Sequence, residues 1–397
     1  MTTTAIDIAV VGAGPVGLAL ALHAAVLLPH ASVSVFDSRA SEHDVSGDAR
    51  TLALSLGSVQ LLQRLGAWPE GVAQPILQVQ VSQAPPTLAP LPIGPPEVRI
   101  VAAAEGVPML GAVLKYGQLV APLQRAWMQA AQREPQRLFS RFGTPVRACK
   151  ALADGIELDA GIAERFDLGV IAEGGVFAGQ LRKALTHDYR QTAWVGTVTL
   201  DGGTPGLAVE RFTRHGPLAL LPLPTPAGAA GQAALVWCVD SDDDPVRGLD
   251  DSQRIAVLNT QLPDAAGRVS AISPLKDFAL GLNAERTLVD GRSVRIGNAA
   301  QTLHPVAGQG LNLGLRDAFE LVQALRAGGD IDAALKRVEW SRAADRWSMI
   351  AATDLLARVF TWGLPGVAEA RGLGLALLQR AGPLKSQLAR RMMFGSR

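Results

Sequence analysis

The chain has 397 residues, a formal net charge of +1 at pH 7 and 48% hydrophobic residues. Its length suits two domains or one large domain, and its nearly balanced charge gives no indication of a nucleic-acid or acidic partner. The two cysteines, Cys149 and Cys238, lack metal-ligand spacing, which predicts free thiols in a cytoplasmic protein without a metal site. We expect neither a signal peptide nor a transmembrane segment, because no basic region precedes the first apolar stretch and no run of about 18 apolar residues occurs.

The chain opens on the pattern of a nucleotide-binding βαβ unit. An apolar strand precedes Gly12-x-Gly14-Pro15-x-Gly17 and a helix rich in alanine and leucine. In such a turn the first glycine permits the bend, the second admits a pyrophosphate, and the third lets the helix pack on the strand. The next strand, "ASVSVFDS", carries Asp37, which can bond an unphosphorylated ribose and would repel a 2′-phosphate. The motif predicts a dinucleotide site and leaves FAD and NAD both open.

The following residues predict mixed elements. Leucines at helical spacing predict a helix over 54–65, and the proline-rich stretch 75–98 predicts a strand and a long loop. A helix is expected over 116–133, and a short hairpin followed by a buried strand over 155–175.

Strands dominate the next part of the chain, in "TAWVGTVTL", "LALLPLP" and "AALVWCVD". They predict an antiparallel sheet, after which "SVRIGNAA" predicts a buried strand and the residues beyond Gly310 predict mostly helix. This order predicts an α/β fold in which a nucleotide-binding domain is interrupted by a β-rich insertion. The expected boundaries are 1–75, 99–180 and 281–345 for the nucleotide-binding domain, 76–98 and 181–280 for the β-rich substrate domain, and 346–397 for a C-terminal helical segment.

Four separated stretches resemble one known family. The first glycine turn and "IGNAAQTLHPVAGQGLNLGLRDA" are similar to the two FAD motifs of single-component flavoprotein aromatic hydroxylases. With "YRQTAWVGTV" and "ERFTRHGPLALLPLP", they resemble the ubiquinone-biosynthesis hydroxylases, which act on polyprenylated phenol rings. The resemblance covers nearly the whole chain. It implies a Rossmann-like FAD domain of the para-hydroxybenzoate hydroxylase type with an inserted antiparallel sheet, non-covalent FAD, O2 as co-substrate and NAD(P)H as reductant.

The resemblance also implies which residues hold the FAD, at both ends of the chain. The helix that opens near Gly310 would direct free N–H groups at the pyrimidine edge of the flavin, where reduction places negative charge. The implied contacts are Gly12, Gly14, Pro15 and Gly17 at the pyrophosphate, Asp37 at the adenosine ribose, Arg50 at the phosphate and ribityl region, Gln118 at the flavin, Gly297 and Asn298 at the ribityl chain, and Pro305, Gly308, Gly310, Leu311 and Asn312 under the isoalloxazine.

Two positions depart from the family pattern. Asn298 stands where the family has an aspartate, and Glu173-Gly174 stands where it has an Asp-Gly pair that contacts both FAD and NAD(P)H. An amide still bonds a ribityl hydroxyl, and the longer Glu173 keeps its charge. We interpret both as tuning of the FAD site. If they instead mark its loss, the chain is a flavin-poor accessory subunit.

Three residues are candidates for catalysis. The motif places His304 and the adjacent Pro305 nearest the flavin. His304 suits a proton relay, and a structural histidine bonding loop carbonyls is the alternative. Tyr189 begins the sheet expected to form the floor of the substrate site, where it is a candidate partner for the substrate phenol, with ordinary packing as the alternative.

The C-terminal segment, residues 353–395, mixes leucines, Phe360 and Trp362 with Lys385 and Arg391. It either covers the core or forms an amphipathic surface for the inner face of the membrane or for a ubiquinone-biosynthesis complex. The predicted function is FAD-dependent hydroxylation of a polyprenylated phenol or benzoquinol, like that of a 2-polyprenyl-6-methoxyphenol hydroxylase. The alternatives are an FAD hydroxylase of a small soluble aromatic and the accessory subunit.

Overall fold

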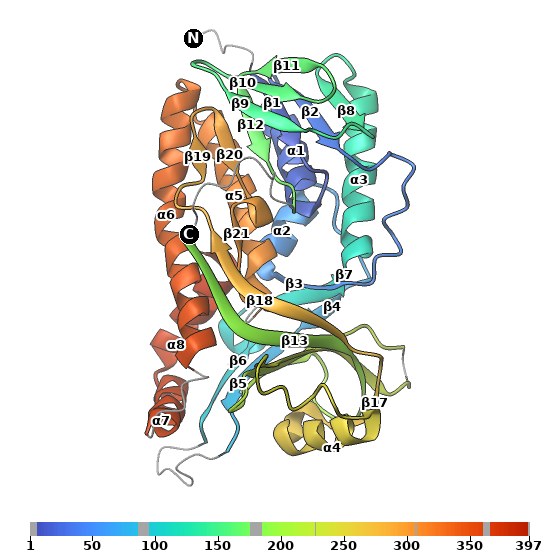
Figure 1. Cartoon of the computed structure of the whole chain (residues 1–397), viewed down its shortest axis with the longest axis vertical. Helices are drawn as coiled ribbons and strands as arrows, with labels where there is room; N and C mark the ends of the chain where they lie inside the picture. The colour runs from blue at the N-terminus through green and yellow to red at the C-terminus, as the bar shows by residue number, and fades with distance from the viewer. Residues whose placement is uncertain are drawn as a thin grey trace.

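The computed structural model describes residues 6–85, 95–174, 185–226, 228–305, 308–359 and 366–395. Figure 1 shows an upper part of parallel strands and helices, a lower part built on a long curved sheet, and C-terminal helices along one side. Within these ranges, no helix has the length and apolarity that crossing a bilayer requires. The predicted α/β organisation is confirmed.

The upper part is built on a six-stranded sheet that is parallel except for one edge pair. Its central strands are buried on both faces, which explains the near-continuous apolar runs "DIAVV" and "LGVI". The expected strand–turn–helix–strand unit at the N-terminus is confirmed. In spatial order the strands are β19 (Val289–Asp290), β20 (Ser293–Arg295), β12 (Leu168–Ile171), β1 (Asp7–Val11), β2 (Ser32–Asp37) and β8 (Leu138–Phe142).

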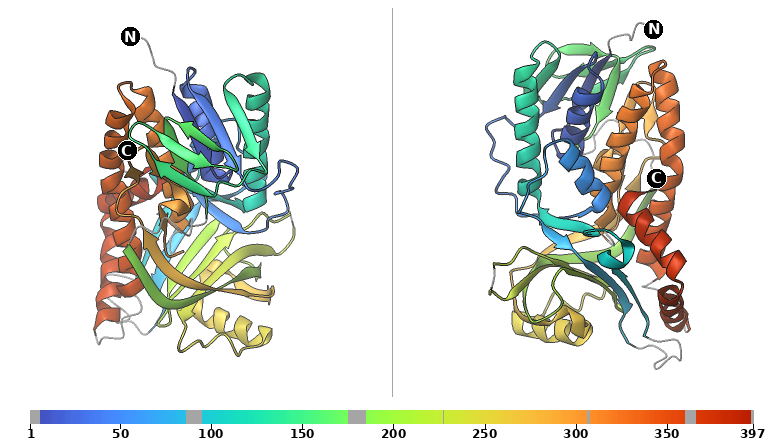
Figure 2. Two further views of the ribbon diagram at one scale, coloured as in Figure 1. Left: turned by 45° about the horizontal axis from the view of Figure 1, so that its top comes forward. Right: turned by 180° about the vertical axis from the view of Figure 1, so that it is seen from behind.

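Side chains of β1 alternate between two cores on opposite faces of this sheet. Ile8 and Val10 join the core shared with the large helices, whereas Ala9 and Val11 pack against a small antiparallel sheet. Figure 2 shows the helices gathered on one face. The helices are α1 (Pro15–Leu27), α2 (Leu56–Arg64), α3 (Tyr116–Arg133), α5 (Gln309–Arg326) and α6 (Ile331–Val359), and the small sheet comprises β9 (Ala148–Ala151), β10 (Ile156–Asp159) and β11 (Ala163–Phe166).

The lower part is a nine-stranded sheet, antiparallel except where β14 meets β5. It contains the strands predicted from the alternating stretches. One face packs on α4 (Asp251–Gln261), a helix that the sequence analysis missed although Asp250 and Gln253 form a capping box. The strands are β21 (Gln301–Thr302), β18 (Lys276–Ala284), β13 (Leu185–Asp201), β16 (Gly231–Asp240), β15 (Pro217–Pro222), β14 (Leu207–Phe212), β5 (Gln78–Gln83) and β6 (Glu97–Val101), with β17 (Arg268–Ile272) beside β13.

A fourth sheet links the two parts and corrects one prediction. Leu54 belongs to a strand and not to the predicted helix, because residues 51–55 pair antiparallel with residues 111–115 before α2 begins. The sheet has the order β3 (Thr51–Ser55), β7 (Gly111–Lys115) and β4 (Gln74–Ile76). The short helices are η1 (Ala102–Glu105), η2 (Asp264–Ala266) and η3 (Gly297–Ala299).

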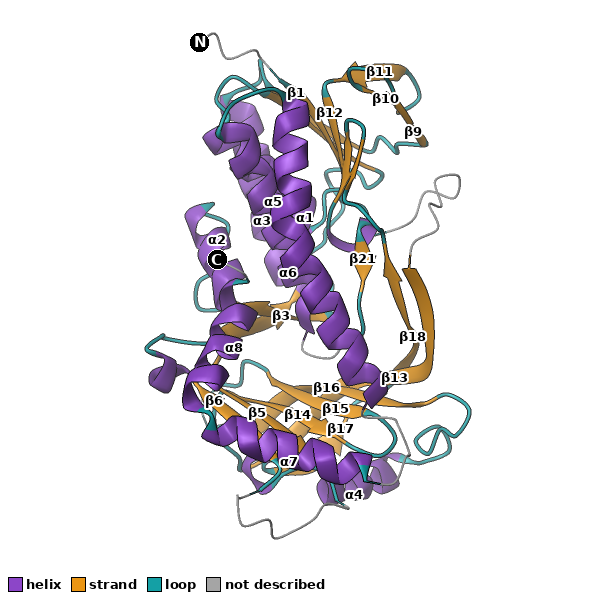
Figure 3. Ribbon diagram, turned by 90° about the vertical axis from the view of Figure 1, so that its left-hand side faces the viewer, coloured by secondary structure: helices purple, strands orange, loops and turns teal. Residues whose placement is uncertain are grey.

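The C-terminal residues form two further helices, α7 (Val367–Arg380) and α8 (Gly382–Phe394). Figure 3 shows α7 along the lower sheet and α8 rising toward α2. Phe360 and Trp362 lie outside the described residues. Two strands run across boundaries expected from the sequence: β6 spans the one between 98 and 99, and β18 the one between 280 and 281.

Candidate FAD site

The glycines of the first motif form a turn in which larger residues would clash. Gly12 has a φ of +107°, and its N–H donates to the carbonyl of Phe36 at 2.8 Å. A Cβ on Gly12 would lie 2.9 Å from the carbonyl carbon of Ala172, and one on Gly17 would lie 2.0 Å from the Gly12 oxygen. The strand, the turn and α1 therefore approach one another as closely as a pyrophosphate-binding turn requires.

Gly14 and Pro15 open the helix over this turn. Gly14 is the N-cap of α1 and Pro15 is its first residue, where its missing N–H costs no hydrogen bond. A Cβ on Gly14 would lie 3.7 Å from the Tyr116 hydroxyl, an ordinary contact. Open space beside the first turn of α1 is what an incoming anionic group needs.

Asp37 lies at the carboxyl end of β2 and is bound by Arg39, a residue that the sequence analysis missed. Its Oδ2 accepts from the N–H of Ala13 at 2.7 Å, and its Oδ1 accepts from the N–H and Nε of Arg39 at 2.8 and 2.9 Å. Burial by itself would raise the pKa of Asp37, but these hydrogen bonds hold the pKa below its usual range. Asp37 is therefore an ionised acceptor beside the glycine turn.

Arg50 and Gln118 both lie near Tyr116, the first residue of α3. The hydroxyl of Tyr116 lies beside Gly14 of the glycine turn. The guanidinium of Arg50 lies 4.1 Å from the centre of the Tyr116 ring, and its Nη2 pairs with Asp48 at 2.7 Å. The Oε1 of Gln118 accepts from the N–H of Lys115 at 3.0 Å and so caps α3. Arg50 is solvent-exposed, which leaves its charge accessible to a phosphate.

Glu173 shares this edge of the sheet with Asp37. Burial raises the pKa of Glu173, and the charge of Asp37 raises it further. The backbone N–H of Glu173 faces Gly12, whereas Gly174 is exposed with no neighbour within 4 Å of its Cβ position. The two carboxyl groups follow β2 and β12, the parallel strands on either side of β1, at the carboxyl edge where ligands bind open α/β sheets.

The late motif meets the early one at α5. Gly297 has a φ of +60°, and a Cβ on Gly314 would lie 2.7 Å from the Gly297 Cα and 2.9 Å from a methyl group of Val16. The N-terminal ends of α1 and of η3 are therefore brought together against α5. Asn298, beside Gly297, is exposed.

Asn312 anchors the start of α5. Its Oδ1 accepts from the Ser55 N–H and the Ser58 hydroxyl, each at 2.8 Å, and its Nδ2 donates to the carbonyls of Ala53 and Gly308 at 3.1 and 3.0 Å. These bonds use the side chain's whole capacity within the protein. The residues around Asn312 have other surroundings. Gly308, the N-cap of α5, has a φ of +58°. Gly310 has open space at its Cβ position, and Leu311 packs on the core.

His304 and Tyr189 meet where β13 approaches the loop before α5. The buried Nε2 of His304 donates to Gln191 Oε1 at 2.9 Å, and its ring lies edge-on to Tyr189 at 5.1 Å. The Tyr189 hydroxyl donates to Asp354 Oδ1 on α6 at 3.0 Å; burial raises the pKa of Tyr189, and this bond raises it further. Pro305 is exposed beside them. No local sequence pattern marks Asp354, which lies far along the chain.

Because His304 is buried in its neutral form, we expect the free energy of unfolding to depend on pH. Burial lowers the pKa of His304 to about 4, so below its ordinary value the unfolded chain binds a proton that the folded chain does not. The free energy of unfolding is expected to fall by up to roughly 3 kcal/mol as the pH drops from about 6.5 to about 4. His304→Gln should show a flatter curve in denaturant unfolding across this window. If the unfolding free energy of His304→Gln depends on pH as steeply as that of wild type, His304 is not the group responsible.

A bulge in β13 sets the direction of these side chains. The pairing with β18 shifts between Asp188 and Gln191, and Arg190 there has a φ of 52°, the one non-glycine positive φ among the described residues. Bulges commonly re-aim side chains next to active sites.

This backbone strain gives a second testable prediction. A left-handed conformation costs an L-residue about 1–2 kcal/mol, and β-branched residues are the least tolerant of it. Arg190→Gly should therefore match or exceed wild-type stability, whereas Arg190→Val should be less stable than the glycine variant by more than about 1 kcal/mol. The Arg190–Asp242 ion pair is exposed and both variants lose it, so it cancels in the comparison. Equal urea unfolding midpoints for the two variants would show that the backbone at residue 190 is not strained.

Comparison with known proteins agrees with this geometry. The family model described as FAD binding domain matches residues 216–344. The chain is 33% identical to the ubiquinone hydroxylase UbiL of Rhodospirillum rubrum, over 98% of this chain and 89% of that protein. It is 30% identical to the 3-demethoxyubiquinol 3-hydroxylase of Escherichia coli, over 98% of each chain.

Solved structures share the fold. The p-nitrophenol 4-monooxygenase PnpA from Pseudomonas putida superposes with a TM-score of 0.72 at 16% identity, over 99% of each chain. HpxO from Klebsiella pneumoniae, complexed with FAD and uric acid, superposes with a TM-score of 0.67 at 16% identity, over 98% of this chain and 97% of that one. The implied fold of the para-hydroxybenzoate hydroxylase type is confirmed. The chain belongs to the ubiquinone-biosynthesis hydroxylases, a family of FAD-dependent monooxygenases that act on aromatic rings.

Proposed function

We propose that this chain hydroxylates the ring of a polyprenylated phenol or benzoquinol, as a 2-polyprenyl-6-methoxyphenol hydroxylase does. The observation that carries the proposal is the meeting of the two motifs, where Gly314 on α5 touches both Gly297 and Val16 of α1. The first turn of α1 then lies beside α5 at Gly314 and, through the N–H of Ala13, beside the ionised Asp37, which suits a dinucleotide whose pyrophosphate carries negative charge.

The residues fit FAD in two groups. Gly12, Gly14, Pro15 and Gly17 would receive the pyrophosphate and Asp37 the adenosine ribose. The remaining contacts that we propose are Arg50, Gln118, Glu173, Gly174, Gly297, Asn298, Pro305, Gly308, Gly310 and Leu311, with Asn312 holding the first turn of α5 in place through its side chain. When bound, FAD supplies the two-electron chemistry that activates O2 for insertion into the ring. We also propose the division of the chain into an FAD-binding part and a β-rich part. Its boundaries at 98–99 and 280–281 then move to the ends of β6 and β18.

The chain's own contribution to catalysis that we propose is a hydrogen-bonding relay and an oriented wall. His304 is neutral at physiological pH because burial lowers its pKa to about 4. A base this weak does not retain a phenol proton, so we propose that His304 orients the phenol through a hydrogen bond and relays its proton without holding it. Tyr189 donates to Asp354, so we propose that it shapes the wall and does not itself deprotonate the phenol. Pro305 holds the backbone beside His304. Glu173 is the residue we propose to contact both FAD and the NAD(P)H reductant.

The first test is whether the purified protein is yellow. We expect near-stoichiometric FAD, identified after release from the protein. A colourless protein that takes up no added FAD would favour the flavin-poor accessory subunit, with Asn298 and Glu173 marking the lost site. A deletion strain complemented with this chain, followed by mass identification of the quinone intermediates, then decides between the polyprenylated substrate and a small soluble aromatic.

We also propose that α7 and α8 meet an anionic membrane surface at the inner face, where a polyprenylated substrate resides. Four leucines there are between 40% and 57% exposed: Leu373, Leu377, Leu384 and Leu388. Residues 366–395 carry five basic side chains and one acidic side chain. Apolar side chains with a basic surround bind anionic lipid interfaces.

Vesicle binding tests this surface. Leu377→Glu with Leu384→Glu is expected to lower binding to anionic vesicles at least about tenfold and to leave FAD content unchanged. Val26→Glu, a 68% exposed residue on α1, is the matched control and should bind as wild type. Wild-type protein that ignores anionic vesicles but co-purifies with biosynthesis proteins would replace the membrane with the protein complex.

A further inference from the structure

The segment 301–309, which contains His304, is held at its first residue by buried charged groups. Residues 306 and 307 lie outside the described residues. Gln301 is buried, its Nε2 donates to Asp317 Oδ2 at 3.2 Å, and its Oε1 accepts from Arg346 Nε at 2.6 Å. Arg346 also donates to the carbonyl of Glu285, which lies in the segment between β18 and β19. The start of the segment is therefore fixed to both α5 and α6.

The last residue of the segment is held in the same way. Gln309 is buried, and its Oε1 accepts from Arg316 Nη2 at 3.2 Å. Arg316 in turn donates through Nη1 to both oxygens of Asp345, at 3.2 and 3.1 Å, and through Nε to the carbonyl of Asn312 at 3.3 Å. The first turn of α5 is thus tied to α6 through one guanidinium.

One arginine joins the two ends. Arg342 donates through Nε to Asp317 at 2.8 Å and through Nη1 to Asp345 at 2.7 Å. Both carboxylates are fully buried, and Arg342 is almost fully buried. A continuous path of hydrogen bonds therefore runs between the two glutamines. The α5–α6 network is Arg316, Asp317, Arg342, Asp345 and Arg346.

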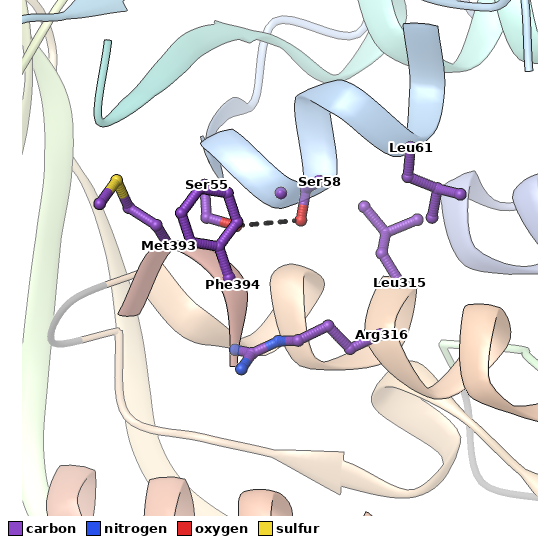
Figure 4. A pocket seen from close by; sticks show the side chains of 8 residues that line it. Ser55, Ser58, Leu61, Leu315, Arg316, Met393 and Phe394 are labelled. Carbon is purple, nitrogen blue, oxygen red and sulfur yellow. Dashed lines mark hydrogen bonds between the residues drawn. The ribbon is translucent and has the colours of Figure 1, made fainter. Parts of the chain in front are cut away.

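The end of α8 covers this network from outside. Figure 4 shows a pocket in which Met393 and Phe394 lie near Ser55 on one side, with Arg316 beneath them. Gly395 has a φ of +78°, and a Cβ there would lie 2.7 Å from Arg316 Nη1. The C-terminal residues thus help to bury Arg316, and its low exposure strengthens its bonds to Asp345 and Gln309.

We propose that the α5–α6 network is a positioning device that fixes both ends of the 301–309 segment against FAD, acting through Gln301 and Gln309. The proposal rests on the proposed function, since it assumes that this segment faces the flavin. A buried ion network contributes little net stability compared with apolar packing. It does impose one geometry, because each member has a required partner at a set distance. The midpoint is fixed independently by the His304–Gln191 bond from β13.

Gln309→Met tests the proposal, because it removes the acceptor for Arg316 and keeps the side-chain length. Arg316 retains Asp345, so the chain should still fold. We expect FAD to bind about tenfold more weakly, as the loss of one hydrogen bond to a charged group implies. We also expect a shifted flavin absorption spectrum and a more negative reduction potential. The unfolding temperature of the FAD-free protein should stay close to wild type.

Arg337→Met, on α6, is the matched control. Arg337 Nη1 donates to the carbonyl of Ala324 at 3.3 Å, near the end of α5 that is far from the 301–309 segment. It should lower the unfolding temperature and leave the FAD spectrum, potential and affinity unchanged. Arg316→Met removes the same bond together with those to Asp345, so it should repeat the spectral effect at a lower unfolding temperature. The double variant should add little to the spectral effect of Arg316→Met.

The outcomes separate the two proposals. If wild-type protein binds no FAD, the proposed function fails. If it binds FAD but Gln309→Met shows the wild-type spectrum, potential and affinity, the FAD site stands and the positioning proposal is overturned. Equal spectral changes in Gln309→Met and Arg337→Met would also overturn it, because a general loss of packing would then be the cause.

Discussion

Gly17→Ala is expected to yield a destabilised protein that does not retain FAD. Its Cβ would lie 2.0 Å from the carbonyl oxygen of Gly12, so either α1 moves away from β1 or the turn opens. Overpacking of this kind costs roughly 1–3 kcal/mol and occasionally more. Opening the turn also moves the helix N–H groups away from a bound pyrophosphate. Thermal unfolding of the FAD-free protein and FAD titration measure the two effects separately.

Gly14→Ala is the matched control in the same turn. A Cβ there would lie 3.7 Å from the Tyr116 hydroxyl, so the FAD-free protein should unfold at the wild-type temperature. FAD affinity should nevertheless fall at least about tenfold, because the second glycine admits the pyrophosphate to the backbone. A Gly17→Ala protein with wild-type stability and full FAD content would show that this turn does not bind the FAD pyrophosphate.

Asp345→Asn is expected to cost the FAD-free protein about 3–5 kcal/mol, the typical price of breaking a buried ion pair from one side. Asp345 is fully buried and accepts from both Arg316 and Arg342, at 3.1 and 2.7 Å. An amide cannot compensate two guanidinium charges that water does not reach. Urea unfolding of the FAD-free protein measures the loss.

Asp332→Asn, also on α6, shows what an exposed pair contributes. Its partner Arg292 lies at 2.7 Å, but the Asp332 side chain is 59% exposed. Surface ion pairs are worth about 0–1 kcal/mol, so this variant should be nearly as stable as wild type. Similar losses for the two aspartates would mean that burial does not set the strength of the α5–α6 network.

The features that the sequence alone predicted are those with a local cause. The turn at Gly12, Gly14 and Gly17 follows from three backbone positions that a side chain would block. The helix over 116–133 follows from its periodicity, and the antiparallel sheet from alternation along each strand. Resemblance then extended the FAD contacts to the late motif. The helix predicted to begin at Leu54 was wrong at that end, because the leucines there also fit a helical spacing and only pairing with β7 decides for a strand.

Other features were decided only by the tertiary structure. Asp354 lies beside Tyr189 only because the fold brings together a strand and a helix that are far apart in the chain. The α5–α6 network is the clearest case. In sequence, Arg316, Asp317 and Arg342 read as charges on the solvated faces of amphipathic helices. They are buried because α5 and α6 pack with these faces toward each other, and no helix alone specifies the neighbour that will cover it.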